Sequence, residues 1–223
     1  MREGATTKSV SGNSAAPQSI VYVVDDDVAL RDALSSLFRS VGLQVELFGS
    51  APEFLTKKLP DSPSCLVLDI RLPGVSGLDF QAQLVKSNVM MPIIFMTGHG
   101  DVPMSVRAMK AGAIDFLSKP FRDQDMLDAV FSALEAGRKQ LETKRDVADL
   151  VTQYQSLTPR EKEVMAYVTK GLMNKQIAGE LQLSEITVKI HRGQVMRKMG
   201  VRSVADLVRA AEKLGVEAKG SHR

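Results

Sequence analysis

The sequence of 223 residues contains no tryptophan, three tyrosines and a single cysteine. That cysteine, Cys65, has no second cysteine of this chain to pair with. It stands in an apolar segment, where a small buried core residue in a reducing compartment is expected. Aromatic residues make up only 5% of the chain. Proteins that bind single-stranded nucleic acids stack bases on aromatic side chains, so this scarcity argues against RNA binding of that kind.

Long apolar runs are also missing. No segment approaches the roughly 18–20 consecutive apolar residues that a membrane-spanning helix needs, and the amino terminus has no apolar stretch typical of a signal peptide. We therefore expect a cytoplasmic protein with no membrane partner. Residues 1–18, rich in Ser, Thr, Ala and Gly without a periodic apolar pattern, are predicted to form a flexible tail.

Charge is distributed unevenly along the chain. Hydrophobic residues at 44% and charged residues at 25% describe a globular protein, and the length allows one large domain or two ordinary ones. Residues 19–134 carry 10 Lys and Arg against 14 Asp and Glu, a net charge of −4. Residues 156–223 carry 13 against 7, a net charge of +6. An acidic part followed by a basic part predicts different partners, with nucleic acid the leading candidate for the basic one.

The first part of the chain alternates short β-rich apolar segments with segments of helical spacing. The apolar segments lie at residues 20–24, 44–48, 65–68, 92–96 and 114–118, and helices are expected at 28–41, 52–58, 78–86, 102–111 and from residue 122 onward. Continuous apolar strands linked by right-handed helical crossovers build a parallel sheet that is covered on both faces. The fold class predicted here is therefore α/β, a doubly wound five-stranded parallel sheet.

Polar residues close several of these strands. Asp25, Asp26 and Asp27 follow the first strand, Asp69 ends the third, Thr97 ends the fourth, and Lys119 follows the fifth. A single aspartate after a strand is commonly a helix cap, Thr97 alone is an ordinary strand residue, and Lys119 alone is an ordinary loop charge. Together they are expected in one crevice, because functional groups of such sheets gather beyond the carboxyl ends of the strands. Crowded carboxylates suit a hard cation such as Mg²⁺.

A long helical segment joins the two parts. Leu134, Leu141 and Ala148 recur every seven residues, but Arg138 and Arg145 occupy the companion seam, so an extended connecting helix is favoured over a coiled coil. The predicted domains are a sheet domain at 19–134, a helical linker at 135–155 and a small all-α domain at 156–220.

The C-terminal domain is predicted to be entirely helical. Thr158-Pro159-Arg160-Glu161 is a capping box with proline at the first helical position. Asn174, Ser184 and Ser203 are expected to cap the next three helices. A short helix, a tight turn and a longer basic helix form a helix-turn-helix.

Several motifs carry a close family resemblance. Val-Val-Asp-Asp-Asp, Leu-Asp-Ile-Arg-Leu-Pro-Gly-Val-Ser-Gly, Met-Thr-Gly-His-Gly-Asp and Ala-Gly-Ala-Ile-Asp-Phe-Leu-Ser-Lys-Pro-Phe resemble those of bacterial response-regulator receiver domains. Leu-Thr-Pro-Arg-Glu-Lys-Glu-Val, Asn-Lys-Gln-Ile-Ala and Thr-Val-Lys-Ile-His resemble LuxR-type helix-turn-helix domains. The combination, over residues 20–214, is similar to the NarL/FixJ group of two-component transcription factors.

The resemblance implies roles at the strand ends. Asp69 matches the phosphoacceptor, whose carboxylate attacks a phosphohistidine of a sensor histidine kinase. Asp26 would bind Mg²⁺ with Asp69 and the backbone carbonyl of Arg71, and Asp25 would help through water. Asp27 is expected to cap the first helix.

Three further residues match switch positions of the family. Thr97 would hydrogen-bond the new phosphoryl oxygens, and Lys119 would pair with them as a point charge. The Lys119-Pro120 bond is expected to be cis, as in relatives. Phe116 matches the aromatic switch, although the residues alone do not distinguish it from a plain core aromatic.

The basic helix is expected to contact DNA in two ways. The face opposite Val188 and Val195 is predicted to enter the major groove, with Lys189 and Ile190 the best candidates for base contact. This face consists of Ile186, Lys189, Ile190, Gly193 and Arg197, with Gln194 beside them. Phosphate contacts are expected at Asn174, Lys175, Thr187, Arg192 and Lys198. Gly193 weakens the helix and provides no side-chain contact where relatives can carry a long one.

The expected partners are a sensor histidine kinase, double-stranded promoter DNA, RNA polymerase and, after phosphorylation, a second copy of the chain. Relatives dimerise through the fourth helix and fifth strand; the corresponding residues here are Val106, Arg107, Lys110, Ala113 and Ile114. A phosphatase is the competing function, but such enzymes place a second carboxylate two residues after the nucleophile, where this chain has Arg71. The chain is thus predicted to be a transcription regulator and not an enzyme.

Overall fold

The computed structural model describes residues 19–87, 89–98 and 102–216. The chain divides into two compact units, Met1–Leu141 and Glu142–Arg223, and each is described by itself. The range 1–18, predicted as a flexible tail, lies outside the described residues. Within them, no helix is both long and apolar enough to cross a membrane.

The first unit contains the predicted parallel sheet. The order of its strands is β2-β1-β3-β6-β7, and all neighbouring pairs are parallel. The strands are β1 (Ile20–Val24), β2 (Gln44–Phe48), β3 (Ser64–Asp69), β6 (Ile93–Thr97) and β7 (Asp115–Ser118). A separate hairpin pairs β4 (Arg71–Leu72) with β5 (Val75–Ser76). The fold predicted from the sequence is confirmed, and the carboxyl ends of β1, β3 and β6 lie at one edge.

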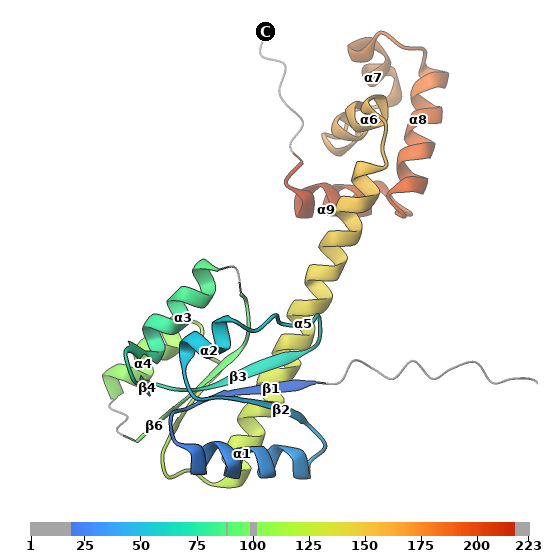
Figure 1. Ribbon diagram of the computed structural model, residues 1–223. Helices are drawn as coiled ribbons and strands as arrows, with labels where there is room; N and C mark the ends of the chain where they lie inside the picture. Colours follow the sequence, from blue (N-terminus) through green and yellow to red (C-terminus); the bar gives the residue numbers. More distant parts are fainter. Residues whose placement is uncertain (1–18, 88, 99–101, 217–223) are drawn as a thin grey trace, which may run out of the picture. The chain divides into compact units, whose positions relative to one another are not determined.

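Helices cover both faces of this sheet (Figure 1). They are α1 (Val28–Ser40), α2 (Ala51–Leu55), α3 (Gly77–Lys86), α4 (Val102–Lys110) and α5 (Asp123–Gln155). The side chains of a strand alternate between its faces. Tyr22 therefore packs on the face of α2, α3 and α4, while Val21 and Val23 pack on the face of α1 and α5.

The two cores differ in character. On the α2–α4 face, Tyr22, Phe48, Phe54 and Phe80 form a chain of tilted and edge-on ring contacts. On the other face, Leu34 and Phe38 of α1 pack against aliphatic strand residues and α5. Val28 at the start of α1 and Val41 directly after its end are exposed. The buried residues of α1 are Leu34, Ser35 and Phe38, on the side of the helix that faces the sheet.

Helix α5 contributes to the cores of both units. Gly137 is buried, and a Cβ there would lie 2.6 Å from the carbonyl oxygen of Ser64, so glycine is needed for this close approach. In the second unit, Leu150 and Tyr154 pack against the helical core. The stretch 135–155, predicted as a linker, therefore has residues of a domain core at each end.

The second unit is a small helical domain. Its helices after α5 are α6 (Pro159–Thr169), α7 (Asn174–Leu181), α8 (Glu185–Lys198) and α9 (Val204–Leu214). Thr158, Ser184 and Ser203 cap α6, α8 and α9 as predicted. The prediction that Asn174 caps α7 was wrong. Asn174 is the first helical residue, Met173 precedes it, and the backbone N–H of Met173 donates to Oε1 of Gln176 at 2.8 Å.

Candidate functional site

Three aspartates meet at the carboxyl edge of the sheet. Because Val24 of β1 pairs with Leu68 of β3, the residues that follow them are neighbours. One carboxylate oxygen from each of Asp25, Asp26 and Asp69 lies within 4.8 Å of the others. Asp25 is fully buried, Asp69 is 7% exposed, and Asp26 is exposed. The predicted gathering of carboxylates at the strand ends is therefore present, with one of the three open to solvent.

Lys119 joins two of these carboxylates. Its Nζ donates to Oδ2 of Asp25 and to Oδ2 of Asp69, at 2.6 Å in each case. The backbone brings Lys119 there: its N–H donates to the carbonyl oxygen of Thr97 at 2.7 Å, and the Lys119-Pro120 bond is cis as expected. Thr97 is fully buried at the end of β6. Strand-end residues from β1, β3, β6 and β7 are thus brought to one place.

The charges of this site influence one another. Burial raises the pKa of Asp25, and the hydrogen bond from Lys119 opposes that rise without cancelling it. Burial by itself would lower the pKa of Lys119, but its hydrogen bonds to Asp25 and Asp69 prevail and raise it. The lysine therefore stays protonated, and its positive charge offsets part of the negative charge of the two buried carboxylates.

Local backbone contacts position the carboxylates. The N–H of Asp27 donates to Oδ1 of Asp25 at 2.9 Å, and the N–H of Arg71 donates to Oδ1 of Asp69 at 2.8 Å. Asp27 itself caps α1, as predicted, by accepting from the N–H groups of the second and third residues that follow it. A Cβ on Gly77 would lie 2.7 Å from the carbonyl oxygen of Asp69. The glycine therefore allows the start of α3 to approach the end of β3.

The donor set fits a magnesium ion. Carboxylate oxygens are the ligands that Mg²⁺ prefers, and it keeps several waters when one or two carboxylates bind it. Asp26 is exposed, whereas Oδ1 of Asp69 accepts from the backbone N–H of Arg71. The cluster therefore combines a carboxylate that is open to solvent with carboxylates that hydrogen bonds hold in place. Asp26 and Asp69 could bind the ion directly, with Asp25 helping through water. The backbone carbonyl of Arg71 as a further ligand stays a prediction.

The predicted aromatic switch and dimer residues lie in α4, in β7 and in the segment between them. Phe116 is half-buried and packs against the α2–α4 core. Val106, Arg107 and Lys110 are exposed on α4, as a contact surface requires. Ile114 is half-buried, and Ala113 is 7% exposed and belongs to the core. The expectation that Ala113 offers a contact surface is corrected, because its methyl group already packs inside the unit.

Helix α8 presents two opposite stripes. Val188, Val195 and Met199 are buried. The predicted DNA-facing residues Ile186, Lys189, Ile190, Gly193 and Arg197 are all exposed, and Gln194 is half-buried beside them. At the end of α8, Arg197 donates to Oε1 of Gln194. The structure therefore places the predicted base-contacting face outward over the whole length of the helix.

The predicted phosphate contacts differ in whether they bond to other residues of the domain. Lys175 is exposed, whereas Arg192 donates to Oδ1 of Asn174 at 3.0 Å and so connects α8 to α7. The hydroxyl of Thr187 lies 2.8 Å from that of Ser184, the residue that caps its helix.

Lys198 has a structural role that the sequence did not predict. Its Nζ donates to Oε2 of Glu161 at 2.7 Å and to the carbonyl oxygen of Ser156 at 3.3 Å. Glu161 is only 5% exposed and also accepts from the N–H of Thr158 at 2.8 Å. Lys198 therefore joins the end of α8 to the start of α6, and its contact with a DNA phosphate stays a prediction.

Sequence reasoning missed three structural roles. Glu161 was recognised as part of a capping box, but no local pattern links it to Lys198, 37 residues later. The close approach at Gly77 could have been suspected from the Pro-Gly-x-x-Gly turn directly before a helical pattern. Gln81, whose side-chain amide donates to the carbonyl oxygen of Ala111 at 2.9 Å, had no sequence signal.

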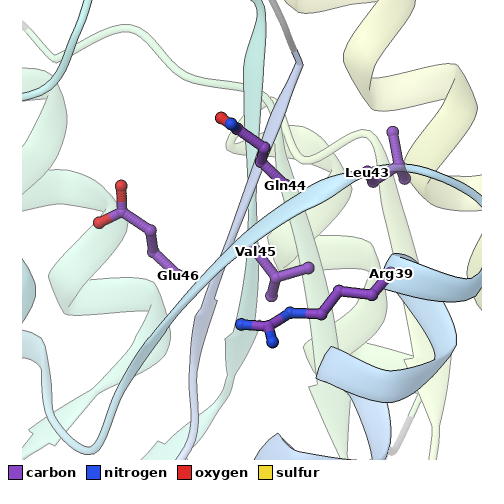
Figure 2. A pocket seen from close by; sticks show the side chains of 5 residues that line it. All are labelled: Arg39, Leu43, Gln44, Val45 and Glu46. Atoms are coloured by element: carbon purple, nitrogen blue, oxygen red, sulfur yellow. The ribbon is translucent and has the colours of Figure 1, made fainter.

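A shallow pocket of about 420 Å³ lies at the other end of the sheet. Arg39, Leu43, Gln44, Val45 and Glu46 line it, and Figure 2 shows their side chains spread along and around β2. The register pairs Gln44 with Ile20 at the start of β1, far along the strand from Asp25. This pocket therefore does not belong to the acidic site.

An acidic strand-end cluster bridged by a lysine, on a doubly wound sheet, is followed by a helix-turn-helix domain with an exposed basic helix. These features define a two-domain regulator with a receiver-type domain and a DNA-binding domain. Comparisons with known proteins agree. Residues 21–131 match the model of the response regulator receiver domain, and residues 155–211 match that of the bacterial regulatory proteins of the luxR family.

Relatives match over nearly the whole chain. Nodulation protein W of Bradyrhizobium diazoefficiens is 60% identical over 204 residues, which are 92% of this chain and 90% of that protein. Response regulator protein TodT of Pseudomonas putida is 50% identical over 88% of this chain and 86% of its own. The solved structure of the response regulator StyR is 48% identical, with a TM-score of 0.76, and covers 88% of this chain and 99% of that one.

The chain belongs to the NarL/FixJ type of response regulators, which join a receiver domain to a LuxR-type DNA-binding domain. It is a two-component transcription regulator. Its receiver domain implies a histidine kinase as partner, and its second domain implies DNA binding. Receiver domains bind Mg²⁺ at an acidic pocket, and this chain has a cluster of three aspartates that could hold a metal ion.

Proposed function

We propose that Asp69 accepts a phosphoryl group from a sensor histidine kinase, with Mg²⁺ held by Asp25, Asp26 and Asp69. The observation that carries this assignment is the position of Lys119, whose Nζ lies 2.6 Å from Oδ2 of Asp69 and 2.6 Å from Oδ2 of Asp25. A fixed ammonium beside a carboxylate is a preformed partner for the charge that a phosphoryl group adds. Asp69 is favoured over Asp25 because Asp25 is fully buried.

The transfer follows from the chemistry of the groups. A carboxylate oxygen of Asp69 attacks the phosphorus of a phosphohistidine; the new P–O bond forms as the P–N bond breaks, and the electron pair returns to the imidazole nitrogen. Such transfers need positioning and charge stabilisation more than covalent help. Lys119 then pairs with the phosphoryl oxygens, and the hydroxyl of Thr97 donates to one of them. When bound, Mg²⁺ offsets the negative charge that builds up between the incoming phosphoryl group and the carboxylates.

Phosphorylation with a small acyl-phosphate donor tests the assignment. The wild-type chain should gain one phosphoryl mass, only with Mg²⁺ present, and Asp69→Asn should gain none. Asp79→Asn is the matched control, because Asp79 is an exposed aspartate of the same unit at the start of α3. Asp26→Ala should keep the nucleophile but lose most of the labelling rate. A phosphoryl mass on the Asp69→Asn variant would contradict the proposal.

We further propose that phosphorylation produces a dimer that binds paired half-sites in promoter DNA and contacts RNA polymerase there. The exposed α4 residues Val106, Arg107 and Lys110, next to the half-buried Phe116, support a surface that responds to the acidic site. Two α8 helices held together raise the affinity for one duplex through effective concentration, without any new DNA contact.

Light scattering with and without beryllofluoride, a mimic of the phosphoryl group, tests the dimer. The mass should double when beryllofluoride and Mg²⁺ are added, and the affinity for DNA should rise in parallel. Arg107→Glu should remain a monomer, whereas Arg138→Glu, on an exposed part of α5, should still dimerise. Tighter DNA binding at an unchanged mass would exclude the dimer mechanism and favour release of an inhibitory contact between domains.

A further inference from the structure

Two large apolar side chains stand on the outward stripe of α8. Ile186 is 74% exposed and Ile190 is 58% exposed. Each is two positions from Val188, which is fully buried, and two positions correspond to about 200° around an α-helix. Both isoleucines therefore point away from the core, in the one helix of the domain that is proposed to enter DNA. The following inference rests on that proposed DNA binding.

Isoleucine can recognise only a limited set of DNA features. It cannot hydrogen-bond to a phosphate or to the polar edge of a base, and the apolar group that the major groove offers is the C5 methyl of thymine. Lys189, exposed between the two isoleucines, provides the charge that draws the helix to DNA. We infer that Ile186 and Ile190 read two thymine methyl groups in each half-site. Because they are four residues apart, their anchor points differ by about 6 Å along the helix, or roughly two base-pair steps.

Gly193 continues the same stripe. It lies seven residues after Ile186 and three after Ile190, and it is exposed. Apart from its chain neighbours and the backbone of its own helix, no heavy atom in the described part of the chain lies within 4 Å of the position that a Cβ would take there. The fold thus does not require glycine, and glycine weakens a helix relative to alanine. Its use is explained if the α8 backbone approaches the groove closely at this turn and so brings both isoleucines to the methyl groups.

Replacing thymine by uracil tests the inference directly, because uracil keeps base pairing and lacks only the methyl group. Duplexes are first enriched from a random library by the full chain with Mg²⁺ and beryllofluoride. They are then remade with deoxyuridine in place of each thymidine in turn. At two positions of the half-site, the substitution should weaken binding about fourfold, the value for about 0.8 kcal/mol per buried methyl group.

Variants link each methyl group to its reader. In Ile186→Ala the uracil penalty should disappear at one position, and in Ile190→Ala at the other. Val151→Ala should keep both penalties, because Val151 is a comparably apolar exposed residue outside α8. Gly193→Ala should weaken binding of the thymine duplex at least tenfold while slowing amide exchange in α8. Gly179→Ala is its control, since Gly179 is exposed in α7 with equally open space around it, and it should leave DNA affinity unchanged.

Three outcomes would overturn the inference. Equal affinity of the wild-type chain for thymine and uracil duplexes would exclude methyl recognition. A uracil penalty that persists unchanged in both isoleucine variants would assign the effect to the shape of the DNA. In both of these cases DNA binding itself would stand. Failure to enrich any duplex above background would instead overturn the proposed DNA binding, and the inference with it.

Discussion

Replacing Lys198 by methionine tests whether this residue stabilises the C-terminal unit or contacts DNA. Its Nζ lies 2.7 Å from Oε2 of Glu161, whose residue is only 5% exposed. Burial by itself would raise the pKa of Glu161, but the hydrogen bonds from Lys198 and Thr158 lower it. The methionine keeps the length of the side chain and removes the charge, so the Glu161 carboxylate loses its cation.

The expected loss of stability is moderate. A hydrogen bond to a charged group contributes about 1.5–3 kcal/mol. Because the N–H of Thr158 still donates to Glu161 at 2.8 Å, we expect a loss around the lower end of that range, about 1–2 kcal/mol. A change of this size increases the population of open states roughly 5–30-fold. Amides of α6 and α8 should exchange faster by that factor, while those of β3 in the first unit should not change.

The effect should also depend on pH. The folded-state pKa of Glu161 lies below its ordinary value of 4.5. The stabilisation by its ionised form is therefore complete above that pH, and it is lost as the pH falls through the lower folded-state pKa. In Lys198→Met the part of this offset that comes from Lys198 is lost, so the pKa of Glu161 rises. The difference in exchange between variant and wild type should be largest near neutral pH and should shrink in acid.

Hydrogen-exchange mass spectrometry of the full chain provides the readout, together with the salt dependence of DNA binding. Lys175→Met is the matched control, since Lys175 is exposed at the start of α7. It should leave exchange unchanged but flatten the slope of log affinity against log salt by about 0.9. Lys198→Met should speed the exchange of amides in α6 and α8 and leave the slope of log affinity against log salt unchanged. Unchanged exchange with a flattened slope for Lys198→Met would refute the structural role of Lys198 and support its assignment as a phosphate contact.

Two further predictions concern the receiver site. Lys119→Met should destabilise the first unit by about 2–3 kcal/mol near neutral pH. Because burial already raises the pKa of Asp25, this loss of stability should shrink as the pH falls and the carboxylate is protonated. Thermal unfolding measures the loss, and a loss that does not change with pH would contradict the prediction. Gly77→Ala would place its Cβ 2.7 Å from the carbonyl oxygen of Asp69, so it should cost about 1–3 kcal/mol and slow labelling of Asp69 by an acyl phosphate. Gly49→Ala, whose Cβ would meet only side-chain atoms at 3.7 Å or more, should change neither quantity.

Local sequence patterns predicted the sheet and the positions of its polar residues. The apolar run before Asp25 and the run that ends in Asp69 are strands buried on both faces, and such strands have continuous apolar sequences. Parallel strands bring their carboxyl ends to one edge, so the crevice followed from chain order alone. Caps at Thr158, Ser184 and Ser203 were predictable for a similar reason, because each cap involves residues at most three positions away.

Contacts between distant residues were decided by the tertiary structure. Lys119 bonds to Asp25 across 94 positions and to Asp69 across 50, and Lys198 bonds to Glu161 across 37. The residue types showed that these charges needed partners, but only the packing of strands and helices chose them.

Exposure was decided in the same way. Ala113 and Arg107 both lie in the segment expected to form a contact surface, yet Ala113 is buried in the core and Arg107 is exposed to solvent. Met173, not Asn174, precedes α7, and its backbone N–H is bound by the side chain of Gln176. Sequence periodicity determines which elements form. The rotation and the ends of each helix depend on what the neighbouring elements leave room for, and that is a property of the folded chain.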